Sequence, residues 1–188
     1  MGSASKVGEW QWAAALLLLI ATILLINPGT YIGGGMDDWR YLASARCWVD
    51  QGPCLPQNHW EGRWPLIAGM SGSILLLGES RLALGLWPLI ASVVAMFMVA
   101  HVGNRLFGRP IGWWGAGLLA ITSPVASQLL LPSVEALELA LVAGGFLLLL
   151  NWKDGRSRWS AAAAGLCFGL ALQVRETAAP AILLCLIY

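Results

Sequence analysis

Long apolar blocks, separated by short polar breaks, run through most of the chain. A bilayer core about 30 Å thick is crossed by roughly 20 helical residues, and most of the blocks approach that length. Their approximate bounds are 10–26, 82–102, 111–131, 134–152, 159–174 and 178–188. The pattern predicts an all-α fold, a polytopic membrane helix bundle with about six spans.

The last block is still apolar at Tyr188, the final residue of this sequence. A helix that stopped inside a bilayer would leave its last carbonyl groups without hydrogen-bond partners. We therefore expect residues 1–188 to form the N-terminal part of a longer transmembrane domain.

Two further segments have helical character but are too short to span the bilayer. In segment 37–50, four apolar side chains share one helix face: Trp39, Leu42, Ala45 and Val49. This spacing predicts an amphipathic helix that lies flat in the membrane interface, entered through the flexible residues Gly33–Gly35. Segment 64–77 is apolar throughout, and its length favours a re-entrant or interfacial helix.

The basic residues predict how the chain is oriented. Arg and Lys gather in two short loops, 104–109 and 153–158. The positive-inside rule makes both loops cytoplasmic, together with Lys6 at the N-terminus. The loop at residues 30–64 is then non-cytoplasmic, and segment 64–77 does not cross, because a crossing would carry both basic loops outside.

Composition supports a membrane protein and excludes some other classes. Of the 188 residues, 58% are hydrophobic and 11% are charged, whereas soluble domains have about 25% charged residues. The net charge of +1 provides no basic field for nucleic acid, so membrane lipid is the expected surroundings. No group of His, Cys and carboxylate residues has the spacing of a metal site, so no metal is expected.

The acidic pair Asp37-Asp38 is the strongest candidate for chemistry. A carboxylate here could act as a general base toward an acceptor hydroxyl group. The alternative is structural, because Asp is favoured at helix starts, where it accepts backbone N–H groups and meets the positive end of the dipole. The two roles are compatible, since a capping carboxylate keeps one oxygen for a ligand.

Basic residues beside the predicted membrane surface are candidates for binding a phosphate. Arg63 precedes segment 64–77, and its guanidinium group suits either an oxyanion or a lipid headgroup. Arg175 follows the block at 159–174 and either joins the site or pairs with Glu176. Cys47 and Cys54 in the same outer loop could form a disulfide.

Other polar residues near the outer surface complete the candidate set. Glu135 opens the block at 134–152, where a carboxylate also suits a helix start. Glu138 lies one turn deeper and should face the protein interior or a wet cavity. Glu61 and His59 precede Arg63 and are included as substrate-binding candidates, although a lone His in a loop is more often a surface residue.

The order of these features resembles the GT-C membrane glycosyltransferases, in particular the protein O-mannosyltransferase-like group that includes bacterial aminoarabinose transferases. An acidic pair, a tyrosine and small residues follow the first span, as in 37–43, and Arg63-Trp64-Pro65-Leu66 resembles the stretch that leads into the next helix. Further similar segments are Gly52, Pro56, 81–82, 105–108, 122–124, Glu135 and 169–175. This chain departs from the family pattern at Asp38 for Glu, Arg63 for Lys and Trp64 for Pro.

The resemblance implies an inverting glycosyltransferase in a bacterial inner membrane, with the N-terminus in the cytoplasm. The implied donor is a polyprenyl-phosphate-linked sugar, and the acceptor is a hydroxyl group of a glycan, lipid or protein. Asp37 is the implied general base and Asp38 its catalytic neighbour. Arg63 and Arg175 would stabilise the leaving phosphate, with Tyr41 in the substrate-binding set.

Three other functions compete with a transferase. Gly69-Met70-Ser71-Gly72, followed by His101, resembles a rhomboid-type serine protease motif. Counted along the helices, however, Ser71 and His101 should differ in depth by roughly 20 Å. A transporter subunit would use Glu138 and Arg175 as pathway residues, but it does not explain the long outer loop. The remaining alternative is a helix-bundle scaffold.

Overall fold

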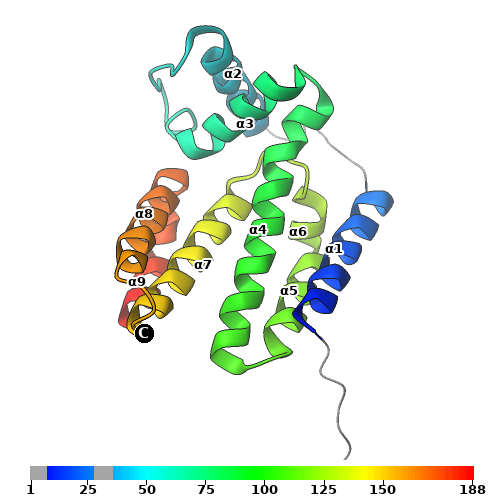
Figure 1. Ribbon diagram of the computed structural model, residues 1–188. Coiled ribbons are helices and arrows are strands. Elements are labelled where there is room, and N and C mark those ends of the chain that lie inside the picture. Colours follow the sequence, from blue (N-terminus) through cyan, green and yellow to red (C-terminus); the bar gives the residue numbers. More distant parts are fainter. Residues whose placement is uncertain (1–7, 28–35) are drawn as a thin grey trace, which may run out of the picture.

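In the computed structural model, residues 8–27 and 36–188 can be described, and they contain helices and no strand (Figure 1). The first predicted segment corresponds to α1 and the flat amphipathic segment to α2, while Gly33–Gly35 lie outside the described residues. The bounds are α1 Glu9–Ile26, α2 Met36–Gln51, α3 Trp64–Leu77, α4 Arg81–Phe107, α5 Ile111–Ile121, α6 Ser123–Gln128, α7 Val134–Lys153, α8 Trp159–Val174, η1 Glu176–Ala178 and α9 Ala179–Ile187. The all-α prediction is therefore confirmed.

The helices form two parts (Figure 1). Helices α2 and α3 pack against each other at one end of the molecule, and we call this pair the cap. The bundle consists of α1 and α4–α9, with α4 at its centre between α5 and α7. The two parts meet where α3 packs against the first turns of α4 and the end of α8.

Three helices are long and apolar enough to span a membrane, namely α1, the segment Leu82–Phe107 of α4, and α7. The shorter apolar helices are α3, α5, α8 and the stretch from Glu176 to Ile187. About six spans were expected, and three of the described helices are long enough to cross a membrane. Many large apolar side chains on α1, α8 and α9 are exposed, as is usual for helices that face lipid.

The predicted block at 111–131 is interrupted, which corrects its assignment as one continuous helix. Helix α5 ends at Ile121, and Thr122 has an extended conformation with φ −62° and ψ 138°. Helix α6 then begins with Pro124 in its first turn. Because proline has no backbone N–H, it cannot continue the hydrogen-bond ladder of α5.

Exposed tryptophans mark one end of the bundle. Four of them lie at helix ends that meet there, and each is about half exposed or more: Trp10, Trp114, Trp152 and Trp159. Tryptophan rings gather at membrane–water interfaces, so this band places one headgroup layer at the end of the bundle opposite the cap.

The cap uses a different face of α2 from the one predicted. Leu42 and Ala45 are buried as expected, but Trp39 is 53% exposed. Tyr41 and Ser44, which are not among the four residues of the predicted apolar face, are also buried against the rest of the protein. The buried face is therefore rotated toward Tyr41, because α3 packs on that side and covers it.

Candidate active site

Six of the eight predicted site residues line one polar cavity where the cap meets the bundle. Its volume is about 410 Å³. The six are Asp37, Asp38, Tyr41, Arg63, Glu135 and Arg175. They come from α2, the start of α3, the start of α7 and the end of α8, which the fold brings to the same level.

Helix α2 presents three of these side chains from its first two turns. The helix begins at Met36, so Asp37 and Asp38 both lie in its first turn, where carboxylates are favoured by the helix dipole. Asp37 is exposed and lines the cavity, which leaves its carboxylate accessible to a ligand. This position is compatible with both the structural and the chemical interpretation of the pair.

Arg63 is placed by Tyr41. It is the residue that precedes α3, and its Nη1 donates a hydrogen bond to the Tyr41 hydroxyl oxygen. Burial raises the pKa of Tyr41 above its ordinary value, while the Arg63 charge opposes this rise and the charges of Asp37 and Glu135 add to it. Tyr41 is therefore a neutral phenol at physiological pH and orients the guanidinium group toward the cavity.

Arg175 is held between two carboxylates of α7. Its Nη1 lies 3.1 Å from Glu135 Oε1 and 3.9 Å from Glu138 Oε2. Glu135 and Glu138 are one helical turn apart, so both can face the same guanidinium group. The pairing with Glu176 is not formed in this arrangement, since Arg175 points to α7 instead.

Two predicted residues lie elsewhere. His59 is exposed, and its ring stacks on Trp60 with 3.6 Å between ring centroids. Glu61 accepts hydrogen bonds from the Gln57 backbone N–H and the Asn58 side chain, each at 2.7 Å, and so shapes the loop. The structure does not bring either residue to the cavity lining.

Sequence reasoning missed Gln128 and Ser133, which also line the cavity. Gln128 is the last residue of α6, and Ser133 immediately precedes α7. A polar Gln inside an otherwise apolar block was the available signal. A Gln in such a block indicates a contact with water or a polar cavity. The predicted continuous helix did not show which side of the bundle this side chain would face.

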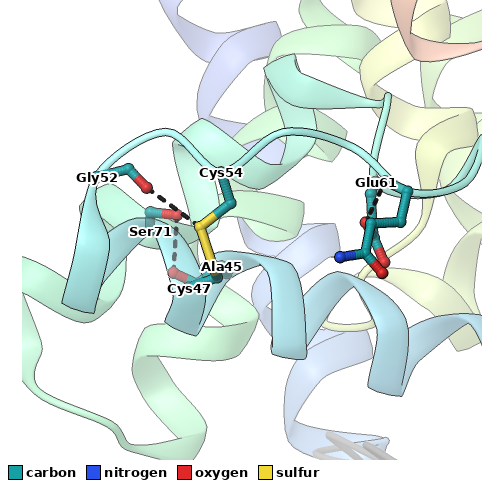
Figure 2. Close-up of a disulfide and its surroundings, with 7 residues drawn as sticks. Ala45, Cys47, Gly52, Cys54, Glu61 and Ser71 are labelled. Atoms are coloured by element: carbon teal, nitrogen blue, oxygen red, sulfur yellow. Dashed lines mark hydrogen bonds between the residues drawn. A yellow bond between two sulfur atoms is a disulfide. The ribbon is translucent and has the colours of Figure 1, made fainter.

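The loop that carries Arg63 is tied to α2 along its length. Figure 2 shows the Cys47–Cys54 disulfide, which joins the end of α2 to this loop. Farther along, the Arg40 guanidinium lies 3.8 Å from the centroid of the Trp60 ring. With the Arg63–Tyr41 contact, these links fix the loop on one side of α2.

An apolar cavity of about 310 Å³ adjoins the polar one. It lies among α4, α5, α6 and α7, where Ala95, Met96 and Leu139 are part of its lining. Gln128, Ser133 and Glu135 line both cavities. A ligand with a charged head and an apolar chain could therefore occupy the two together.

The protease alternative is not supported by the geometry. Ser71 is buried, and its hydroxyl group contacts the carbonyl oxygens of Ile67 and Ala45, as Figure 2 shows for Ala45. His101 lies near the far end of α4 and contacts the Phe97 carbonyl oxygen. Ser71 therefore clamps α3 onto α2 and is not a nucleophile beside a base.

Comparison with protein families gives a match to part of the chain. Residues 66–188, about two thirds of the chain, match the model of a family described as dolichyl-phosphate-mannose-protein mannosyltransferase. Comparison with curated proteins and with solved structures gives no match. The match begins inside α3 and contains Glu135 and Arg175, but Asp37, Tyr41 and Arg63 precede it. The chain belongs to the dolichyl-phosphate-mannose-protein mannosyltransferase family and is a membrane glycosyltransferase of the GT-C kind.

Proposed function

We propose that this protein transfers a sugar from a polyprenyl-phosphate donor to an acceptor hydroxyl group, with inversion and with Asp37 as general base. The observation that carries this proposal is one cavity lined by Asp37, Arg63 and Arg175 together. The family supports the donor class, because its members use polyprenyl-phosphate-linked sugars. The acceptor is a glycan, a lipid or a protein.

The chemistry follows from the charges in the cavity. The Asp37 carboxylate takes the proton of the acceptor hydroxyl as its oxygen attacks the anomeric carbon of the sugar. A bond forms from that oxygen to the sugar, and the bond from the sugar to the phosphate oxygen breaks. The polyprenyl phosphate leaves with an added negative charge, which Arg63 and Arg175 stabilise through charge-assisted hydrogen bonds.

Neighbouring residues position these groups. Tyr41 orients Arg63 through its hydroxyl oxygen, and Glu135 holds Arg175 at the cavity. Asp38 also lines the cavity and would contact sugar hydroxyl groups. The adjoining apolar cavity supports a donor with an isoprenoid chain, because it would receive apolar groups next to the phosphate site.

The proposed site lies at the cap end of the bundle, which the positive-inside pattern predicts to be non-cytoplasmic. The donor would enter from the lipid without leaving the bilayer. The family match favours this transferase over a transporter subunit or a scaffold.

The base assignment is tested with Asp37→Asn, which keeps the size of the side chain and removes its basicity. We expect transfer from dolichyl-phosphate mannose, the donor that the family description names, to fall by about 10²–10⁴-fold. Asp50→Asn is the matched control, since Asp50 is an exposed carboxylate on the same helix that does not line the cavity.

Both variants should remain inserted and folded, as judged by size-exclusion chromatography and circular dichroism. Turnover by Asp37→Asn at the wild-type rate would show that another group takes the proton. An equal loss in Asp50→Asn would show that the effect is not specific to the cavity.

A further inference from the structure

A second polar cavity lies at the end of the bundle opposite the cap, where α1, α4 and α7 come together. Its volume is about 440 Å³. The charged residues that line it are Glu9, Arg105, Arg109, Asp154 and Arg156. The proposed sugar transfer uses none of these residues.

The arginines that line this cavity form ion pairs, but these pairs do not use all of their N–H donors. Arg105 pairs with Asp154 and donates a hydrogen bond to Asn151 Oδ1 at 2.9 Å, which links α4 to the end of α7. Arg109 pairs with Glu9 of α1. The side chains of Arg109 and Arg156 are 57% and 65% exposed. A guanidinium group has five N–H donors, so one carboxylate contact leaves several donors for a ligand.

The charge and polarity of the cavity indicate what it would bind. Three guanidinium groups and two carboxylates give one net positive charge, which a phosphodiester with a single negative charge would neutralise. The carboxylate oxygens of Glu9 and Asp154, which also line the cavity, can accept hydrogen bonds from hydroxyl groups on the same ligand.

The position of the cavity favours a lipid headgroup over a free anion as its ligand. It lies at the end of the bundle that carries the exposed band of Trp10, Trp114, Trp152 and Trp159, at headgroup level. Basic pockets between membrane helices on the cytoplasmic side bind the headgroups of anionic lipids. The positive-inside pattern predicts this same end to be cytoplasmic.

We propose that this cavity binds the headgroup of an anionic phospholipid that carries a phosphodiester and hydroxyl groups, as phosphatidylglycerol does. Arg109 and Arg156 would hold the phosphate, and the carboxylates of Glu9 and Asp154 would accept hydrogen bonds from the headgroup hydroxyl groups. The bound lipid would bridge α1 and α7, whose ends supply Glu9 and Asp154 to the same cavity.

The test measures lipid retention by the full chain in micelles that contain equal amounts of phosphatidylglycerol and phosphatidylcholine. Native mass spectrometry counts the lipids that stay bound. We expect the wild-type chain to retain a single phosphatidylglycerol in preference to phosphatidylcholine. Arg109→Gln and Arg156→Gln should each lower that preference by about tenfold, the effect of one lost charge-assisted hydrogen bond.

Arg158→Gln is the matched control, because Arg158 lies in the same polar loop but is placed over the Trp159 ring and does not line the cavity. Its preference should equal that of the wild type. An equal loss in this control, or equal retention of both lipids by the wild type, would overturn the proposal.

A separate arm adds inorganic phosphate to the mixed micelles. If phosphate displaces phosphatidylglycerol from the wild type, the site takes a free anion and the lipid assignment is wrong. If phosphatidylglycerol stays bound, the lipid assignment is supported. All these measurements are independent of sugar transfer, so they stand whether or not Asp37 is the base.

Discussion

A buried phenol determines where the first guanidinium group of the proposed site lies. Tyr41 is 2% exposed, and its hydroxyl oxygen accepts a hydrogen bond from Arg63. A neutral acceptor of this kind holds the side chain without cancelling its charge. Arg175 differs, because two carboxylates surround it and partly neutralise it. Arg63 is therefore the cation better able to meet a phosphate.

The raised pKa of Tyr41 gives a prediction about alkaline pH. The folded state favours the neutral phenol, so the free energy of unfolding should decrease as the pH rises above about 10, the ordinary pKa of tyrosine. The difference between ultraviolet titrations of the wild type and of Tyr41→Phe isolates this side chain, and it should show a phenolate that forms above pH 10. A difference signal that appears below pH 10 would contradict the assignment.

Residue types and their order predicted much of the proposed site. Asp37 was identified as part of an acidic pair that suits a general base, and Arg63 as a guanidinium group that suits an oxyanion. Arg175 was identified because charges at membrane depth are costly without a role. His59 and Glu61 could not be excluded in this way, since loop conformation alone decides where they point. Their hydrogen bond and ring contacts are local, and no periodicity in the sequence encodes them.

At the level of helices, glycines set the distance between α4 and α5. A Cβ atom added to Gly112 would lie 2.1 Å from the Ala100 carbonyl oxygen and 2.3 Å from the Asn104 backbone nitrogen. Contacts this short with backbone atoms cannot be relieved by rotating a side chain. Small residues allow such close approach between membrane helices.

Gly112→Ala should therefore force α4 and α5 apart. We expect a loss of about 1–3 kcal/mol in the free energy of unfolding, the usual cost of overpacking. Gly115→Ala is the control on the same helix, since a Cβ there would meet no atom within 4 Å. Unfolding in detergent, followed by circular dichroism, measures both. Equal stability of the two variants would show that the close approach does not contribute.

The disulfide gives a second prediction at this scale. Cys47 and Cys54 are seven residues apart, and closing so short a loop is worth roughly 2–3 kcal/mol by the chain-entropy model. The double replacement by serine should lower the stability of the cap by that amount. It should also weaken donor binding, because the same loop carries Arg63. Serine at Cys167 and Cys185, which are free thiols, is the control and should change neither property.

The positions of most helices followed from the lengths of the apolar blocks, because a helix that is buried in lipid or protein needs a long run of apolar residues. Segment 64–77 matches α3 at both ends, since Pro65 starts the helix and Gly78, at φ 67°, ends it. The interruption at Thr122 was not predicted, because block 111–131 as a whole is long and apolar enough for one continuous span, although Pro124 was an available signal. The burial of Ser44 was also missed, since it depends on which side of α2 receives α3.

At the scale of the whole molecule, the cap and the Trp band lie at opposite ends of the bundle (Figure 1). This arrangement gives two levels along the membrane normal. The proposed transferase site lies at one level and the proposed lipid site at the other. Helix α7 contributes to both sites, with Glu135 at its start and Asn151 near its end.

The predicted orientation can be tested by labelling. Pro56→Cys, at an exposed loop residue of the cap, should react with a membrane-impermeant maleimide in intact cells. Ser157→Cys, in the loop between α7 and α8, should react only after the membrane is permeabilised. Both are made with Cys167 and Cys185 replaced by serine. Labelling in the reverse order would overturn the orientation.

The proposed site is divided between two parts that meet along few elements. The proposed base Asp37 and the cation Arg63 belong to the cap, whereas Arg175 and its carboxylates belong to the bundle. Any molecule in the cavity therefore touches both parts and joins them. A small tilt of α2 would change the distance between Asp37 and Arg175 without moving any membrane-spanning helix. Binding of the substrate would therefore also align these charged groups.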